Sequence, residues 1–266
     1  MRKAMRRSET NATYWDRRWA EAGSDAASFT DLSIYPIRFA EMVMHNPGER
    51  ALELGCGPGR VVKHYHGLGW QITGIERSQV AVTSILDHDA ALDVRVGDAT
   101  DLELGDGEIT VLMAFGLYHN LEHDLEEALA ESARVLAAGG RFCISMRPDN
   151  IEMRLNERYW RWRNRHRDAV PHFHKWLVDA PGFAAMLERH GLHTQQLQYA
   201  RNMSNLYRVP FLRERCGADA QEQERRAGGY RLNTAGRAID GLLMRRWPAQ
   251  FCNALVFIGT KEGSPR

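Results

Sequence analysis

The stretch Leu52-Glu53-Leu54-Gly55-Cys56-Gly57-Pro58-Gly59-Arg60 decides the fold of this 266-residue chain. It joins a short β-like run, Arg50–Leu54, to a segment expected to be helical. Glycines at such a junction let the backbone turn tightly and approach a ligand closely. The start of a helix adds N–H groups that have no partner within the helix. The stretch therefore predicts a strand, a loop able to bind a ligand, and a helix in succession.

The same rhythm continues after this stretch. Further strands are predicted at Gln71–Glu76, Asp93–Val96, Ile109–Phe115, Arg141–Met146, His193–Tyr199 and Asn253–Thr260. Helices are expected between them, with Ser78 and Asp124 as N-caps and Gly139-Gly140 closing the helix after Asp124. Short apolar strands that alternate with helices predict an α/β fold with a doubly wound, mostly parallel seven-stranded sheet and helices on both faces.

The rest of the chain is expected to complete a single domain, residues 1–266, around a ligand-binding core at residues 49–146. Residues 1–48 are predicted to form an N-terminal helical cap, with helices at about 9–22 and 36–45. Residues 147–180 and 202–247 are predicted to be helical insertions, after the fifth strand and between the sixth and seventh strands.

Composition and charge narrow the class of protein. No apolar run approaches the ~20 residues that cross a bilayer, and no apolar stretch follows the basic Met1–Arg7, so we expect neither a membrane partner nor a secretory signal. The four cysteines are scattered without a C-x-x-C pair, which favours a reduced, cytoplasmic setting and no metal. Charge is uneven: residues 1–146 carry a net −8 and residues 147–266 a net +9.

The glycine loop has several possible ligands when it is taken alone. A dinucleotide fingerprint needs a sixth-position glycine where Arg60 stands, a phosphate-binding P-loop needs G-K-[ST], and a plain turn needs no ligand. Two more strand ends favour a nucleoside. Glu76 closes the second strand, where an acid can accept hydrogen bonds from a ribose diol, and Asp98-Ala99 follows the third, where an adenine edge can be bound.

These motifs resemble those of class I S-adenosylmethionine-dependent methyltransferases. Leu52–Arg60 is similar to the family's hydrophobic-[DE]-hydrophobic-G-x-G-x-G motif, and Phe115–Asn120 to its fourth motif. Arg134–Arg141 resembles its R-x-L-K-P-G-G-R hairpin, with Ala137-Ala138 in place of Lys-Pro, and Tyr14–Trp19 resembles its short aromatic helix over the cofactor. The resemblance implies S-adenosylmethionine as the cofactor. It implies cofactor contacts at Tyr14, Glu53, Gly55, Cys56, Gly57, Gly59, Glu76, Arg77, Asp98, Ala99 and Phe115.

The acceptor of the methyl group is less constrained. The chain lacks the [DN]-P-P-[YFW] motif of enzymes that methylate exocyclic amines of DNA bases, and the Pro-Cys pair of cytosine-C5 enzymes. His119 is the candidate general base, with helix capping or packing as the alternative. Tyr118 is interpreted either as an acceptor contact or as a structural wall.

Arg147–Lys175 is the most distinctive segment of the basic half. Its candidate acceptor contacts are Arg147, Tyr159, Trp160 and His172, since arginines pair with anions and aromatic rings stack on planar groups. Arg154, Arg158, Arg161 and Arg165 form one helical stripe, which fits a solvated surface and an acceptor wall equally well. His172-Phe173-His174 offers too few ligands for a metal, so none is expected.

The leading hypothesis is methyl transfer to oxygen, nitrogen or sulfur of an anionic or aromatic small molecule. An RNA acceptor bound by the basic half is the alternative, along with a non-catalytic cofactor-binding protein. An aminopropyl transferase ranks last, because a polyamine needs an acidic pocket.

Overall fold

The computed structural model describes residues 2–7, 10–11, 13–15, 17, 35–163, 165, 172–201, 204–214 and 232–263. Its main sheet contains β2 (Arg50–Leu54), β3 (Gln71–Glu76), β4 (Val94–Val96), β5 (Ile109–Phe115), β6 (Leu136–Met146), β8 (Leu192–Ala200) and β9 (Ala254–Lys261). Their order is β4-β3-β2-β5-β6-β9-β8. All pairs up to β6 are parallel, whereas β9 runs antiparallel to both β6 and β8. The predicted mostly parallel seven-stranded sheet is confirmed.

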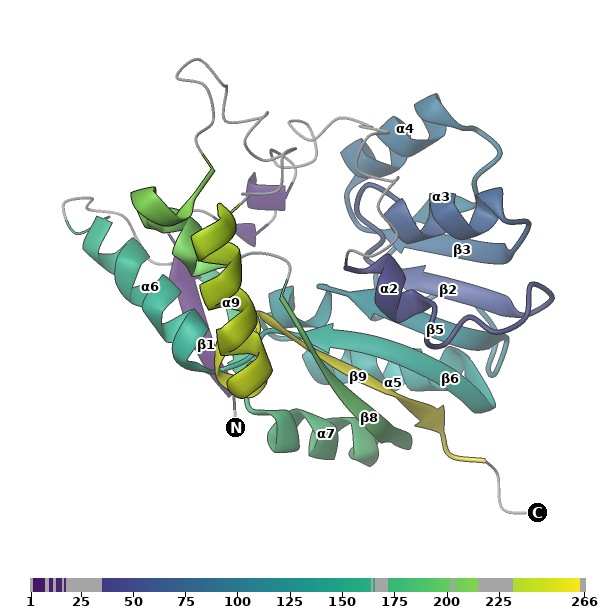
Figure 1. Cartoon of the computed structure of the whole chain (residues 1–266). Coiled ribbons are helices and arrows are strands. Elements are labelled where there is room, and N and C mark those ends of the chain that lie inside the picture. Colours follow the sequence, from purple (N-terminus) through teal and green to yellow (C-terminus); the bar gives the residue numbers. More distant parts are fainter. Residues whose placement is uncertain are drawn as a thin grey trace.

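Helices cover both faces of this sheet (Figure 1). One face carries α2 (Ile37–Ala40), α3 (Arg60–Gly67) and α4 (Gln79–His88), and the other carries α5 (Leu125–Val135) and α7 (Ala180–Arg189). Two apolar clusters separate along the same lines, one including Val61 and Ile85, the other Leu129 and Phe183. This two-sided burial explains why Ile109–Phe115 is almost entirely apolar.

Several predicted boundaries move by a few residues. The second helix ends at Ala40 instead of His45. The amides that follow donate to carbonyls three residues earlier, Met42 N to Phe39 O and Val43 N to Ala40 O, which is the pattern of turns. Gly139-Gly140 does not close α5. That helix ends at Val135, and Leu136 already pairs with Ile109 of β5, so the two glycines lie inside β6. Ser78 caps α4 as predicted, whereas Asp124 precedes α5 without a side-chain capping bond.

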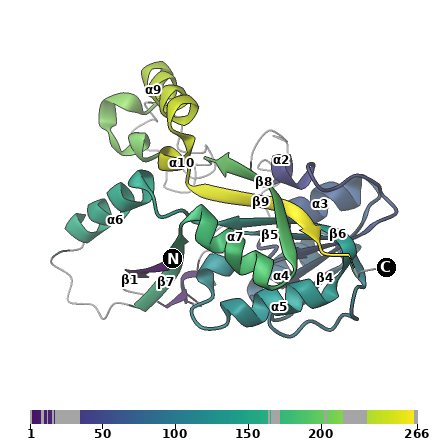
Figure 2. The ribbon, with the colours of Figure 1, turned by 90° about the horizontal axis from the view of Figure 1, so that it is seen from below.

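The N-terminus corrects the prediction of an all-helical cap. Residues Arg2–Arg7 form β1, which pairs antiparallel with β7 (His172–Val178) in a separate two-stranded sheet (Figure 2). Residues 11, 13–15 and 17 are helical as predicted, while Asp16, Arg18 and Trp19 lie outside the described residues. Local sequence does not reveal β1, because its partner strand is about 170 residues away.

The two insertions contain helices, as predicted. After β6 comes α6 (Ile151–Arg163), and after β8 come η3 (Asn205–Arg208), η4 (Pro210–Leu212), α9 (Thr234–Arg246) and α10 (Pro248–Phe251). We call residues 151–163, 204–212 and 234–251 the helical lobe. The prediction for 147–180 missed β7, which ends that insertion as a strand. Within the described part of the chain, no helix has the length and apolarity needed to span a membrane.

Phe257 tests the packing of the antiparallel end of the sheet. Its ring is buried and meets Phe183 of α7 edge-on at 5.0 Å between centroids. Phe257→Ala is expected to lower the free energy of unfolding by about 3–5 kcal/mol, measured by urea denaturation. Leu68→Ala, at an exposed position, should change it by less than about 0.5 kcal/mol. A loss below 1 kcal/mol for Phe257→Ala would contradict this account of the core.

Candidate cofactor and acceptor site

The carboxyl ends of five parallel strands meet at one edge of the sheet. Registered pairs place Leu54 beside Ile75, Glu76 beside Val96, and Phe115 beside Ser145. From β2 the sheet continues to β3 and β4 on one side and to β5 and β6 on the other. Ligands of open α/β sheets bind at such a switch point. The predicted cofactor motifs therefore converge on one edge, although they are spread over sixty residues of sequence.

Backbone geometry in the glycine loop requires glycine. Gly55, Gly57 and Gly59 have φ values of 66°, 54° and 73°, in the left-handed region that other residues disfavour. A Cβ on Gly55 would lie 3.1 Å from Leu117 in the loop after β5, so this glycine also permits close packing there. Gly59 is the N-cap of α3, and the start of that helix faces the site.

Glu76 connects the glycine loop to the next helix. Its Oε2 accepts a hydrogen bond from Gly57 N at 2.9 Å, and its Oε1 accepts one from Ser78 N at 3.0 Å. Each carboxylate oxygen has two lone pairs. Glu76 can therefore hold the loop in place and still accept hydrogen bonds from two ribose hydroxyls.

Glu53 lies beneath the loop as a buried acid. Burial raises its pKa to about 8, and the charge of Glu76 adds to that effect, while the Val62 N–H opposes it. Its Oε2 is buried and has no hydrogen-bond partner among the described residues. Such an oxygen fits a ligand that brings a positive charge and a donor, and the ammonium group of S-adenosylmethionine has both. Cys56 is also buried, beside Gly74, so only its backbone faces the loop.

Asp98 and Arg77 meet at the ends of neighbouring strands. Asp98 Oδ1 accepts hydrogen bonds from Thr100 N and Oγ1, and Arg77 Nε lies 4.0 Å from Asp98 Oδ2. Burial raises the pKa of Asp98, but the Thr100 hydrogen bonds and the Arg77 charge outweigh it and lower the pKa overall. Both side chains remain accessible beside Ala99, on the side expected for adenine.

The loop after β5 is held from two sides. Tyr118 is fully buried and its hydroxyl lies 2.6 Å from Ser132 Oγ in α5. Ser132 donates its own proton to Ala128 O, so Tyr118 donates to Ser132. From the other side, Trp176 of β7 donates to Leu121 O at 2.8 Å. The interpretation of Tyr118 as an acceptor contact is thus corrected: the side chain anchors the loop.

His119 occupies the centre of this loop and is 3% exposed. Burial lowers its pKa well below 6.5, helped by the charges of Arg147, Lys175 and His174. His119 is therefore neutral near pH 7, and its Nδ1 is buried without a hydrogen-bond partner among the described residues. An unsatisfied buried nitrogen is unfavourable unless a ligand or water completes it. The structure leaves both predicted roles, base and packing residue, compatible with this position.

The N-terminal segment lies against the same loop. Asn11 donates to Asn120 O at 3.0 Å, and its Oδ1 lies 3.3 Å from His174 Nδ1. Tyr14 meets the His174 ring edge-on at 5.4 Å. His174 is buried, whereas His172, the predicted acceptor contact, is exposed in β7. His166 lies outside the described residues.

Tyr35 and Ser145 are members of the site that the sequence did not indicate. Their hydroxyl oxygens lie 2.6 Å apart, and Ser145 Oγ accepts from Gly116 N at 2.9 Å. Burial raises the pKa of Tyr35 to about 12, so its hydroxyl is protonated. The Tyr35 ring meets Phe115 edge-on at 5.7 Å. No motif contains Tyr35, and only tertiary packing brings it to the strand ends.

The predicted acceptor contacts of the basic half separate in the structure. Arg147 leaves β6 at the strand ends and donates to Asn253 O at 2.7 Å. Tyr159 and Trp160 instead stack against Arg208, whose guanidinium carbon lies 4.2 and 5.6 Å from their ring centroids. These two rings join the insertions to each other. In the arginine stripe, Arg154 pairs with Asp149 and Arg161 with Glu157, both largely exposed, which favours a solvated surface.

No group of three potential metal ligands occurs among the residues that the structure describes. The strand ends bring together Glu53, Glu76 and Asp98, the acids predicted to bind the cofactor. Beside them lies a basic region around His119. This combination defines a Rossmann-like α/β protein that binds a nucleoside cofactor.

Comparisons with known proteins find a methyltransferase domain within this fold. Residues 52–144 match the model of the methyltransferase domain family. The chain is 30% identical over 138 residues to 27-O-demethylrifamycin SV methyltransferase of Amycolatopsis mediterranei, an alignment of 49% of this chain and 48% of that protein. The chain spans half or less of the length of the curated relatives it matches.

Solved structures agree on the fold. A SAM-dependent methyltransferase from Archaeoglobus fulgidus aligns with a TM-score of 0.59 at 15% identity, over 94% of this chain and 99% of that one. The [4+2]-cyclase SpnF aligns with a TM-score of 0.54 at 16% identity, over 85% and 81%. The domain match over residues 52–144 and the shared fold support a class I S-adenosylmethionine-dependent methyltransferase. The family implies S-adenosylmethionine as cofactor.

Gly57→Val tests the close backbone approach of the loop. The substitution places a branched side chain at a left-handed position whose N–H already binds Glu76, so S-adenosylmethionine binding is expected to be abolished in calorimetry. Gly69→Val is the matched control, since Gly69 has a φ of 81° in a turn away from the site. Equal loss of binding in both variants would show that backbone strain, and not the ligand contact, is responsible.

Glu53→Gln tests the buried acid through pH. Because the folded-state pKa of about 8 exceeds the ordinary value of 4.5, the folded protein retains a proton that the unfolded chain releases. Wild-type stability should therefore fall as pH rises from about 4.5 to 8, and the ligand-free variant should lack this component. Thermal unfolding is measured at pH 5 and pH 8.5. Relative to wild type, the Tm of the variant should be several degrees higher at pH 8.5 than at pH 5.

Two further measurements complete this test. Glu53→Gln should weaken S-adenosylmethionine binding at least tenfold, through loss of a charge-assisted hydrogen bond. Glu49 provides the opposite control, because its hydrogen bond with Arg141 lowers its pKa. Glu49→Gln should therefore lose stability at neutral pH relative to low pH. Parallel stability curves for Glu53→Gln and wild type would refute the buried-acid assignment.

Proposed function

We propose that this protein transfers the methyl group of S-adenosylmethionine to oxygen, nitrogen or sulfur of a small-molecule acceptor with an anionic or aromatic group. The observation that carries this proposal is the juxtaposition of two environments at the strand ends. Acids gather where the cofactor is expected, and positive charges gather around His119. The small-molecule relative from Amycolatopsis supports the acceptor class.

Bound S-adenosylmethionine supplies a methyl group already activated by a sulfonium charge, so the protein mainly has to position the acceptor. Tyr35, Ser145 and Gly116 form a hydrogen-bonded wall next to Phe115. Arg147 is anchored to Asn253 beside this wall and would attract an anionic acceptor. These contacts orient the acceptor by shape and charge.

His119 is the group that would take the acceptor's proton. It is neutral near pH 7, as a base must be, and its buried Nδ1 accepts no hydrogen bond from the described residues. An acceptor hydroxyl, thiol or amine that reached Nδ1 would satisfy this nitrogen and be placed for deprotonation. Residues 147–180 and 202–247 are then the acceptor-side parts of the chain.

The fold by itself permits other reactions, since the cyclase SpnF shares it. RNA is the second candidate acceptor, favoured by the net charge of +9 on residues 147–266. The discriminating experiment incubates the protein with methyl-labelled S-adenosylmethionine and either aromatic carboxylates and phenols or tRNA. Label in a small acceptor supports the proposal. Label in tRNA that falls steeply with salt would replace it.

His119→Ala tests the base. If His119 takes the proton, the variant should lower kcat about 10²–10⁴-fold with S-adenosylmethionine affinity changed less than threefold. Because the pKa of His119 lies well below 6.5, the wild-type rate should stay level as pH falls from 8 to 6.5. Release of S-adenosylhomocysteine measures both. A His119→Ala variant that retains more than a tenth of wild-type kcat would assign His119 a packing role.

A further inference from the structure

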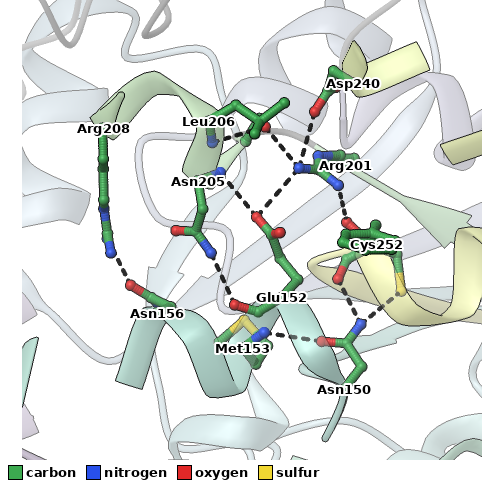
Figure 3. Close-up of polar contacts among 12 residues, drawn as sticks. Asn150, Glu152, Met153, Asn156, Arg201, Asn205, Leu206, Arg208, Asp240 and Cys252 are labelled. Atoms are coloured by element: carbon green, nitrogen blue, oxygen red, sulfur yellow. Dashed lines mark hydrogen bonds and ion pairs between the residues drawn. The ribbon is translucent and has the colours of Figure 1, made fainter. Parts of the chain in front are cut away.

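The helix α6 buries the polar residue Glu152 beside Met153, and it leaves three large apolar residues exposed. Its Glu152 is buried, and Glu152 Oε1 accepts hydrogen bonds from Arg201 at 3.4 Å and Asn205 N at 2.9 Å (Figure 3). One turn later Asn156 Oδ1 accepts from Arg208 at 2.6 Å. Asn150 caps the helix by accepting from Met153 N. The inner side of α6 is therefore fixed by hydrogen bonds to the second insertion.

This network is strong enough to define the orientation of α6. The Arg201 side chain is 5% exposed and pairs with Asp240 of α9 at 2.9 Å as well as with Glu152. A buried charge that loses its partners is costly, so the helix cannot rotate its apolar side inward without a large loss of free energy. The exposed apolar side of α6 is a consequence of this constraint.

Three apolar residues line the opposite side of α6. Ile151, Leu155 and Trp162 are 44%, 52% and 60% exposed. Their positions, i, i+4 and i+11, fall on one stripe of a helix, and the exposed Arg158 at i+7 lies within it. We call these four residues the outer stripe. It extends for about 16 Å along the helix axis, and Figure 2 shows α6 projecting from the periphery of the molecule.

The rest of the helical lobe shares this character. Of the eleven large hydrophobic residues that are exposed in the described chain, eight lie in the lobe: Ile151, Leu155, Trp160, Trp162, Phe211, Ile239, Leu242 and Trp247. Arginines accompany them, including Arg165, whose guanidinium lies 5.1 Å from the Trp162 ring. Clustered exposed apolar residues mark interaction surfaces, whereas scattered ones do not.

We propose that the outer stripe of α6 docks on an anionic membrane surface, lying flat in the interface. Aliphatic and tryptophan side chains on one line of a helix, with arginines among and beside them, match the chemistry of helices that bind negatively charged bilayers. Ile151, Leu155 and Trp162 enter the boundary between headgroups and acyl chains. Arg158 and Arg165 lie at the level of the lipid phosphates.

Two other occupants fit the stripe less well. If a second copy of the chain packed on this stripe about a twofold axis, the Arg158 side chains of the two copies would face each other. No acid in the stripe would offset their repulsion. RNA would pair with the arginines and stack on Trp162, but it has no use for the aliphatic Ile151 and Leu155. Charge and aliphatic content together favour lipid.

The test is sedimentation of the 266-residue chain with vesicles at 0.1 M salt. Wild type should bind vesicles of 70% phosphatidylcholine and 30% phosphatidylglycerol, and should bind pure phosphatidylcholine at least tenfold more weakly. Leu155→Ser with Trp162→Ser should lower binding to the anionic vesicles at least tenfold. Arg158→Gln should lower it about fivefold, the equivalent of ~1 kcal/mol for one basic residue at the surface.

Leu68→Ser is the matched control, since Leu68 is 59% exposed after α3 and should leave binding unchanged. Unchanged circular dichroism in each variant shows that folding is retained. Failure of wild type to bind anionic vesicles, or equal binding by the Leu155/Trp162 variant, overturns the proposal. A dimer in light scattering that this variant abolishes assigns the stripe to a second copy. Binding to tRNA that depends on Trp162 and Arg158 but not on Leu155 assigns it to RNA.

Discussion

The carboxylate of Glu76 is the contact on which the cofactor side of the molecule depends. Through its two oxygens it holds the amide of Gly57 in the glycine loop and the amide of Ser78 at the start of α4. Two segments from different β–α units therefore share one anchor. Gly57, which has a positive φ, is held from the next strand by this acid. Glu53 beneath the loop then supplies a buried acidic oxygen that has no hydrogen-bond partner among the described residues.

Around His119 the neighbouring charges are positive instead. His119 is kept neutral by burial and by neighbouring cations, on a loop fastened to α5 through Tyr118 and to β7 through Trp176. The residues that surround it come from the N-terminus, the strand ends and β7. A site assembled from such distant segments is rigid only when the whole fold is formed, which suits selective positioning of an acceptor.

The two insertions form a third region with a separate constraint. Arg201 joins Glu152 of α6 to Asp240 of α9, so Glu152 is held in the interior of the lobe. An ordinary surface helix places its apolar stripe inside. Here Glu152 and its ion pair with Arg201 occupy the inner side of α6. The outer stripe stays exposed, which is the basis for the proposed docking on a membrane surface.

The sequence alone determined the class of fold and the cofactor motifs, because both depend on local order. Strand periodicity, the glycine spacing and acids at strand ends are read within a few residues of each other, and β2, β3 and β5 have the predicted bounds. What only the tertiary structure decided depends on long-range contacts. The pairing of β1 with β7, the arrival of Tyr35 at Ser145, the burial of Tyr118 and the outward turn of α6 each join segments that are distant in sequence. Local propensity does not report which distant partner a residue will meet, and for the acceptor side that partner determines the chemistry.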